Sequence, residues 1–272
     1  MLVPDLTSRE AASERIARSM DVAAGFSRRL RDRDAPIRTA FIEARRRTDP
    51  DPRLAQILRG NRGGGAVRLK LELSVLWIAV GEGHEVRYPL RLWAELLGLD
   101  NENGQGARRV ANAFGWLESA GLVRSERRPG VETAYWPMEE TRSNRAYTIP
   151  GVRISSTKDE SERRQHRYVK LPAQMWTSGW IAELSGAAIA MLLILLTQAW
   201  PNADREIWFS PSFADQRFRL SEDTRRRGLR ELERADLIRL RRRTLESNTL
   251  TNPRLRNVYQ LQLDRLSRQA DA

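Results

Sequence analysis

The spacing of apolar and polar residues is most regular in the stretch 220–259. Leu229, Leu232 and Leu237 recur on one side of a helix of normal period. Ser221 stands before them as a helix N-cap, and the helix is expected to end near 235–236. Residues 238–241 then alternate apolar and basic side chains, as a half-buried strand does, and a returning strand follows a polar loop. The stretch therefore predicts a helix followed by a β-ribbon.

A similar stretch occurs earlier in the chain. Residues 117–124 read LESAGLVR and residues 232–239 read LERADLIR. Upstream, Ala113 aligns with Gly228, a small residue at a point where two helices could pack closely. In both places a long apolar helix, a short strand and a short helix are expected before the matched segment. A repeat this long predicts two copies of a domain and not a solenoid.

Four segments follow from these patterns. We expect an N-terminal helical arm at 1–62, a first domain at 66–150, an exposed linker at 155–167 and a second domain at 168–264. The glycines at 63–65 are expected to form a flexible joint. The arm carries only a sparse apolar stripe, which favours docking on a neighbouring surface. Dimerisation through this arm is the alternative, so a homodimer remains open.

The net charge of the chain indicates which kinds of molecule it could bind. The chain has 272 residues, a net charge of +12, a pI of about 11.0 and no cysteine. This balance favours polyanions, nucleic acid first and an acidic membrane second. Without cysteine there are no disulfides, zinc fingers or thiol catalysis. The longest apolar run, 187–196, is too short to span a bilayer, and no apolar signal region opens the chain. We expect a cytoplasmic, nucleoid-associated protein without a membrane partner.

The order helix, strand, helix, turn, helix, ribbon resembles the winged-helix superfamily, where the phrase at 232–239 is common. The second half also resembles the plasmid replication initiators of actinobacteria, through 185–188 (SGAA), 208–211 (WFSP), 220–224 (LSEDT) and 256–259 (RNVY). The implied fold is mainly α with small β (α+β): two winged helix-turn-helix domains in tandem after the helical arm. The implied function is sequence-specific binding of double-stranded DNA to initiate or control replication of a plasmid or mobile element. A transcriptional regulator and a non-enzymatic protein-interaction module are the alternatives.

The resemblance also implies which residues contact DNA. In winged helices the third helix enters the major groove and the wing touches the backbone. In the second domain the candidates are Thr224, Arg226, Arg227 and Arg230 on the helix, and Arg241, Arg242 and Arg243 on the wing. By helical spacing, Arg226, Arg227, Arg230 and Arg234 are expected to form a purely basic face of this helix. In the first domain they are Gln105, Arg108, Arg109 and Asn112, with Arg127 and Arg128 at the hairpin. That helix is less basic, so base recognition through Gln and Asn, or protein contact, stays open.

Other chemistry is not indicated. His84 and His166 lack neighbours at metal-ligand spacing, so both are expected at the surface and no metal site is predicted. The glycine-rich stretch 59–65 lacks the Lys-Ser/Thr of a phosphate loop, and no G-x-S-x-G elbow occurs. We therefore expect no cofactor and no enzymatic activity. Tryptophans 77, 93, 116, 200 and 208 lie in apolar segments, which favours core packing over stacking on nucleic-acid bases.

Overall fold

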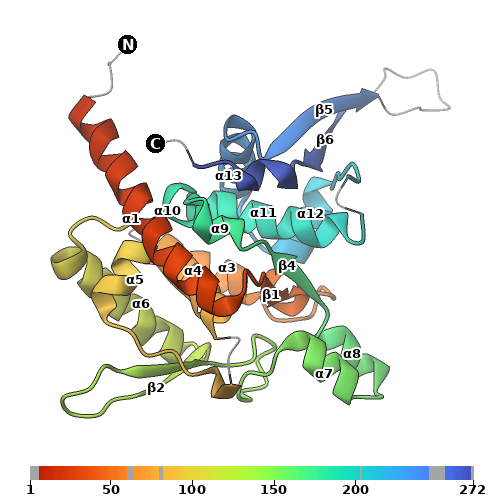
Figure 1. Cartoon of the computed structure of the whole chain (residues 1–272). Coiled ribbons are helices and arrows are strands. Elements are labelled where there is room, and N and C mark those ends of the chain that lie inside the picture. The colour runs from red at the N-terminus through yellow and green to blue at the C-terminus, as the bar shows by residue number, and fades with distance from the viewer. Residues whose placement is uncertain (1–5, 60–63, 80–81, 203, 245–254, 271–272) are drawn as a thin grey trace, which may run out of the picture.

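The protein is described by a computed structural model over residues 6–59, 64–79, 82–202, 204–244 and 255–270 (Figure 1). These residues are mainly helical, and their strands form three small antiparallel pairs, so the fold is α+β. None of the helices in these ranges is long and apolar enough to cross a bilayer.

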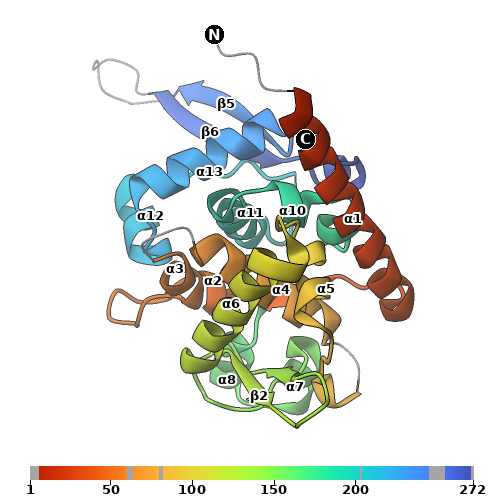
Figure 2. The ribbon, with the colours of Figure 1, turned by 90° about the vertical axis from the view of Figure 1, so that its left-hand side faces the viewer.

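The same order of elements occurs twice. The first set comprises α4 (Gly64–Ile78), α5 (Leu90–Leu96), α6 (Ala107–Ser119), β2 (Val123–Glu126) and β3 (Ala134–Pro137). The second comprises α11 (Gly186–Ala199), α12 (Pro211–Phe218), α13 (Glu222–Arg234), β5 (Ile238–Thr244) and β6 (Leu255–Leu261). Between the first and second helix of each set, one residue bridges to the second hairpin strand: Val86 to Tyr135, and Ile207 to Tyr259. Figure 2 shows α13 with its ribbon in the upper part of the molecule and α6 with its hairpin in the lower part.

Equivalent helices pack in equivalent ways. The apolar helix α4 packs on α6, α11 packs on α13, and α4 and α11 contact each other. The buried side chains of both sets belong to one continuous hydrophobic cluster, with Leu117 and Leu232 completely inaccessible at matching positions. The two sets of elements therefore share a core.

The N-terminal residues pack against neighbouring helices, as the expected docking of the arm requires, and they belong to this core. The elements are α1 (Leu6–Leu30), β1 (Ala35–Arg38), α2 (Thr39–Ile42) and α3 (Arg53–Leu58). Strand β1 pairs antiparallel with β4 (Tyr168–Leu171), and Ile37, Phe41 and Ile42 are inaccessible to solvent. The arm was expected to be helical, but its four residues Ala35–Arg38, which include β-branched Ile37, form a two-stranded sheet with a segment more than a hundred residues away.

Most of the segment 155–167 is exposed, as expected, but His166 is buried and the segment is not an irregular linker. It contains the end of α7 (Pro150–Ser156) and all of α8 (Glu160–Gln165), whose N-cap Asp159 accepts a hydrogen bond from the Ser161 N–H at 2.8 Å. Two short helices, α9 (Gln174–Thr177) and α10 (Trp180–Glu183), then lead to α11. The glycine joint was also wrong where it is described, because Gly64 and Gly65 are the first residues of α4.

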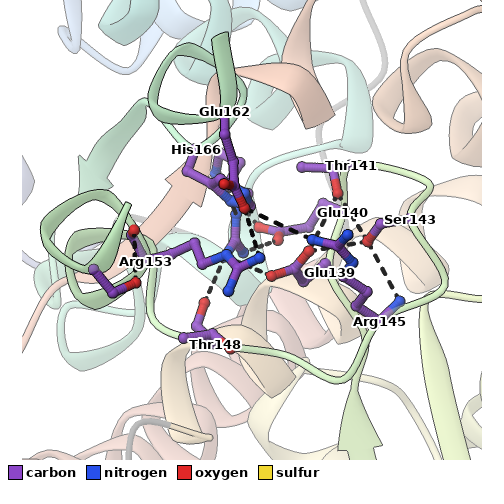
Figure 3. A network of polar contacts seen from close by, with 11 residues as sticks. Glu139, Glu140, Thr141, Ser143, Arg145, Thr148, Arg153, Glu162 and His166 are labelled. Carbon is purple, nitrogen blue, oxygen red and sulfur yellow. Dashed lines mark hydrogen bonds and ion pairs between the residues drawn. The ribbon is translucent and has the colours of Figure 1, made fainter. Parts of the chain in front are cut away.

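A buried polar network ties residues that follow the first set to the N-terminal segment (Figure 3). The guanidinium of Arg38 is inaccessible to solvent and forms an ion pair with Glu140. Its Nε donates to His166 Nδ1 at 3.0 Å, and its Nη2 donates to the carbonyl oxygen of Thr148 at 2.5 Å. His166 is 2 % exposed, so its predicted surface position was wrong. Burial and then the Arg38 charge lower the pKa of His166, which keeps the ring neutral.

Candidate nucleic-acid interface

Helix α13 begins and ends where the sequence predicted. The Ser221 hydroxyl oxygen accepts a hydrogen bond from the Thr224 N–H at 3.2 Å, which caps the first turn. The helix ends at Ala235, and Asp236 then takes a left-handed conformation with φ 56°. The turn before the helix depends on another left-handed residue, Arg219, with φ 55°. These two reversals set the direction of α13 relative to α12 and β5.

Close packing decides which side of α13 faces outward. A Cβ on Gly228 would clash with the carbonyl oxygen of Ala187 on α11, so only glycine permits this approach. Glu231 accepts hydrogen bonds from the N–H and the hydroxyl of Ser185, at 2.6 and 2.5 Å, and so caps the start of α11. Leu232 is buried beside them. The side of α13 opposite these residues is left for solvent.

A groove of about 850 Å³ separates α13 from the ribbon β5–β6. Five arginines and two glutamates contribute to its lining: Arg225, Arg226, Arg230, Arg242, Arg256, Glu222 and Glu233. Helix positions 222, 226, 230 and 233 recur every three or four residues, so they form one face of α13. This face and one side of the ribbon together make a concave basic surface. Among the predicted DNA-contacting residues, it brings together Arg226, Arg230 and Arg242.

The pleat of β5 separates the three predicted wing arginines. Arg242 points toward the groove, whereas Arg241 and Arg243 lie on the other face and pair with Glu206, at 3.5 and 2.6 Å. The hydrogen bond from Arg243 lowers the pKa of the Glu206 carboxyl and keeps it ionised. Arg241 and Arg243 therefore fasten the ribbon to the segment before α12.

The arginine face of α13 is less uniform than the sequence suggested. Arg226 pairs with Glu222 at 2.6 Å, and Arg227 pairs with Asp223 at 3.1 Å. The prediction of a purely basic face was wrong, because acids of the first turn reach arginines one turn later. All four side chains are more than half exposed, so each pair contributes at most about 1 kcal/mol. An incoming phosphate can replace either carboxylate at little cost.

Two other residues of this helix have local roles. The Thr224 hydroxyl lies 2.8 Å from the Ser221 hydroxyl at the start of the helix, where a phosphate would meet the free N–H groups. Arg225, which the sequence did not single out, is buried and pairs with Asp215 at 2.6 Å as well as with the Leu220 carbonyl. It joins α12 to α13. Arg225 stands between Thr224 and Arg226 in a polar run, so the sequence offered no sign of its burial.

The tryptophan prediction was partly wrong. Trp77 and Trp93 are buried, but Trp200 and Trp208 are 69 % and 48 % exposed. Trp208 lies at the groove, and the Arg256 guanidinium carbon is 3.6 Å from the centre of its ring. Alternation along 206–209 is the signal that could have identified it, since Ile207 points inward and its neighbour must point out. Trp208 and Arg256 are thus functional candidates that the sequence prediction missed.

The first set of elements presents a different surface. Its four helix candidates, Gln105, Arg108, Arg109 and Asn112, are all exposed. Within the described ranges, Arg108 and Arg109 form no ion pair. At the hairpin, Arg128 pairs with Glu126 at 2.6 Å and Arg127 approaches Glu118 at 3.8 Å. The structure therefore places all six predicted residues on α6, on the turn before it or on the hairpin, at the solvent surface.

Comparisons with family models, with curated proteins and with solved structures found no match to this chain. The described parts of the chain contain no group of three or more carboxylate or imidazole side chains that could hold a metal ion. The candidate interface is therefore defined by its own geometry.

Proposed function

We propose that this chain binds double-stranded DNA through two winged-helix units, 64–137 and 186–261. The observation that carries the proposal is the repeated order of helix, bridge strand, helix, helix and hairpin, with the bridge strand pairing to the second hairpin strand each time. This is the order of a winged helix, in which the third helix and the hairpin are the parts that meet DNA.

In the second unit, α13 would enter the major groove with its N-terminal half. Arg226 and Arg230 are long enough to reach base edges, and arginine pairs bidentately with guanine. Arg242 and Arg256, across the concave surface, would hold backbone phosphates. Thr224 and the uncapped N–H groups of the first turn would meet another phosphate. Cationic groups line two sides of one groove. A polyanion with closely spaced charges can meet both sides, whereas an acidic protein surface carries more widely scattered charges.

In the first unit, α6 would be the equivalent helix. Arg108 and Arg109 supply charge, whereas Gln105 and Asn112 can each form two hydrogen bonds with an adenine. Arg127 and Arg128 on the hairpin would touch the backbone. Two units in one rigid core would contact two segments of a duplex at a fixed separation, which favours recognition of an extended or repeated site.

Control or initiation of plasmid replication is the role that we favour, on the resemblance of the second half to plasmid initiators. Transcriptional regulation uses the same contacts with DNA and is the second candidate. Selection of bound duplexes from a random library would reveal the site. Repeated sites beside a replication origin support the first role, and a site overlapping a promoter supports the second.

The decisive variant is Arg230→Ala, measured on the selected duplex. Loss of a bidentate guanine contact should weaken binding by about 1–3 kcal/mol and relax the preference at one or two base pairs. Arg234→Ala, one turn further along the same helix and outside the groove lining, is the matched control and should leave the preference unchanged. The proposal is wrong if the chain prefers single strands to duplex, or if duplex binding is insensitive to salt.

A further inference from the structure

The segment between α2 and α3 lies directly against the helix-turn-helix of the second unit. The Ala44 N–H donates to the Arg217 carbonyl oxygen at 2.8 Å. The Arg217 guanidinium donates to both carboxylate oxygens of Glu43, at 2.9 and 3.1 Å, and to the Arg45 carbonyl oxygen at 2.9 Å. The backbone of this segment is therefore held at the C-terminal end of α12.

A second group of contacts holds the rest of the segment. Arg219, in the turn between α12 and α13, donates to Asp51 at 3.1 Å and to the Arg47 carbonyl oxygen at 2.7 Å. Asp49 accepts hydrogen bonds from the N–H groups of Arg45 and Arg46, at 3.0 and 2.7 Å. All these contacts to residues 45–47 use backbone atoms. Their three guanidinium groups, which form no ion pair within the described residues, are therefore displayed beside the start of α13.

Two of these arginines, Arg45 and Arg46, also line a basic groove of about 1150 Å³. Its charged lining consists of Arg45, Arg46, Arg164, Arg167, Lys170, Arg217, Glu43 and Glu160. The cations come from the N-terminal segment, α8, β4 and α12, which are distant in sequence. Partial burial lowers the pKa of Arg45, and the nearby charge of Arg167 lowers it further. Six cations against two acids leave an excess of positive charge that an anion would relieve.

From this geometry we infer that the 45–47 segment and its groove bind phosphates of the DNA duplex whose major groove α13 enters. The inference rests on the proposed function and extends the interface beyond helix and wing. Arg217 and Arg219 stand only a few residues before Ser221, so the segment lies where the sugar-phosphate backbone passes the start of a recognition helix. The contacts with Arg217, Arg219 and Asp49 hold the backbone of 45–47 in place before DNA arrives, which reduces the entropy lost on binding.

The test is the double variant Arg45→Gln/Arg46→Gln, because glutamine retains the backbone contacts that hold the segment. Binding to a long duplex that contains the selected site is followed by fluorescence anisotropy as the salt concentration is raised. We expect affinity to fall on the order of tenfold at physiological salt, and the log–log salt slope to shrink by about two, one for each lost phosphate contact. Base preference at the selected site should not change, since phosphate contacts carry no sequence information.

The matched control is Arg28→Gln/Arg29→Gln. These residues are adjacent and exposed, and they lie at the end of α1, on the opposite side of the molecule from α12 (Figure 2). The control removes the same net charge, so it measures the effect of total charge alone and should leave the slope nearly constant. Circular dichroism melting of both double variants should match the wild type, because neither pair provides a side-chain hydrogen bond or ion pair within the described residues.

The outcomes separate the inference from the proposed function. Failure of the wild type to bind any duplex would overturn both. A second outcome would overturn the inference alone. In it, the wild type binds duplex and Arg230→Ala weakens the binding, but Arg45→Gln/Arg46→Gln behaves like its control. A third outcome would also overturn the inference. If the wild type binds pyrophosphate, and the double variant loses that binding but keeps its duplex affinity, the groove binds a free polyphosphate.

Discussion

The two repeated units have the same elements but distribute charge in opposite ways. In the second unit the core helix α11 buries only glycine and apolar side chains, and most arginines lie outside, on α13 and on both faces of the ribbon. In the first unit the core helix α4 buries Lys70, Glu72 and Ser74, and its third helix is less basic. The hairpins differ as well, with strands of four residues in the first unit and seven in the second. The second unit therefore carries its charged side chains mainly at the surface, whereas the first also buries charged and polar side chains that contact other parts of the protein.

The buried polar groups of α4 explain this difference. The Lys70 ammonium donates to the Ala182 carbonyl oxygen at 2.8 Å, and burial lowers the pKa of Lys70 to about 8. The Ser74 hydroxyl oxygen accepts from the Trp176 indole N–H at 2.9 Å. Through these contacts the first unit is joined to 173–183, and Glu140, just after the unit, pairs with Arg38 of the N-terminal sheet. The first unit therefore anchors the segments that precede the second.

The largest expected effect comes from removing matching core leucines. Leu117→Ala and Leu232→Ala each delete a completely buried side chain and should lower the free energy of unfolding by about 2–5 kcal/mol. Because both leucines belong to one continuous cluster, urea unfolding should show one transition in the wild type and in each variant. Circular dichroism and tryptophan fluorescence should report the same midpoint. Two separated transitions would mean that the units unfold independently.

The sequence predicted local structure better than it predicted connections between distant segments. The α13 cap at Ser221, both hairpins and the small residue at 228 follow from patterns within a few residues, and the structure confirms them. The pairing of β1 with β4 and the burial of Arg38 with His166 join residues 128 or more positions apart. Short apolar segments carry no information about their partners, so the N-terminal sheet was predicted as a helical arm. A charged segment such as 155–167 has no apolar period, so its helices left no signal either.

The same limit applied to the candidate site. Arg226, Arg230 and Arg242 were predicted and lie together, because helix and strand periods determine which face each side chain takes. The first-turn acids were seen in the sequence, but their reach to Arg226 and Arg227 was not. Arg45 to Arg47 were overlooked because their place beside α13 depends on contacts with Arg217 and Arg219, which only the tertiary structure brings near.

The close contact between α11 and α13 offers a sharper comparison of the two third helices. Gly228→Ala should destabilise the protein by about 1–3 kcal/mol, because the new methyl group meets the backbone of Ala187. Gly115→Ala on α6 is the control, since nothing lies within 4 Å of a Cβ there. The control should be neutral or stabilise by up to about 1 kcal/mol through helix propensity. If chemical denaturation shows that both substitutions change the free energy of unfolding equally, the two helices do not differ in how closely they are packed at these glycines.

The buried carboxyl of α4 should give the first unit a pH dependence. Glu72 is completely buried, both its oxygens lack a described hydrogen-bond donor, and burial followed by Glu140 raises its pKa well above the usual range. The folded state then holds a proton that the unfolded state releases once pH exceeds the ordinary pKa of 4.5. The protonated Glu72 therefore makes its full contribution to the free energy of unfolding below pH 4.5. As pH rises toward the folded pKa, the free energy of unfolding falls by about 1.4 kcal/mol per pH unit.

Glu72→Gln removes this titration and retains the shape of the neutral acid. Urea unfolding at about pH 5 and about pH 8 should show a variant that gains stability relative to the wild type as pH rises. Glu183→Gln is a control, because its pKa is also raised but it is exposed beside Lys70. A Glu72→Gln variant with the same pH dependence as the wild type would mean that Glu72 is ionised in the folded state.

The smallest effects should distinguish the two hairpins as DNA contacts. Arg242→Gln removes a groove cation and should reduce the log–log salt slope of duplex binding by about one, with the same loss of affinity for all sequences. Arg241→Gln changes the next residue on the strand, which already pairs with Glu206 on the other face, and should alter the slope less. Arg128→Gln makes the same substitution in the short hairpin of the first unit. A slope reduced as much by Arg128→Gln as by Arg242→Gln would show that both hairpins bind phosphate, and the division of roles between the units would then be wrong. An unchanged slope with Arg128→Gln, beside a reduced slope with Arg242→Gln, would assign phosphate binding to the longer ribbon, whose Arg242 and Arg256 face the groove that α13 shares.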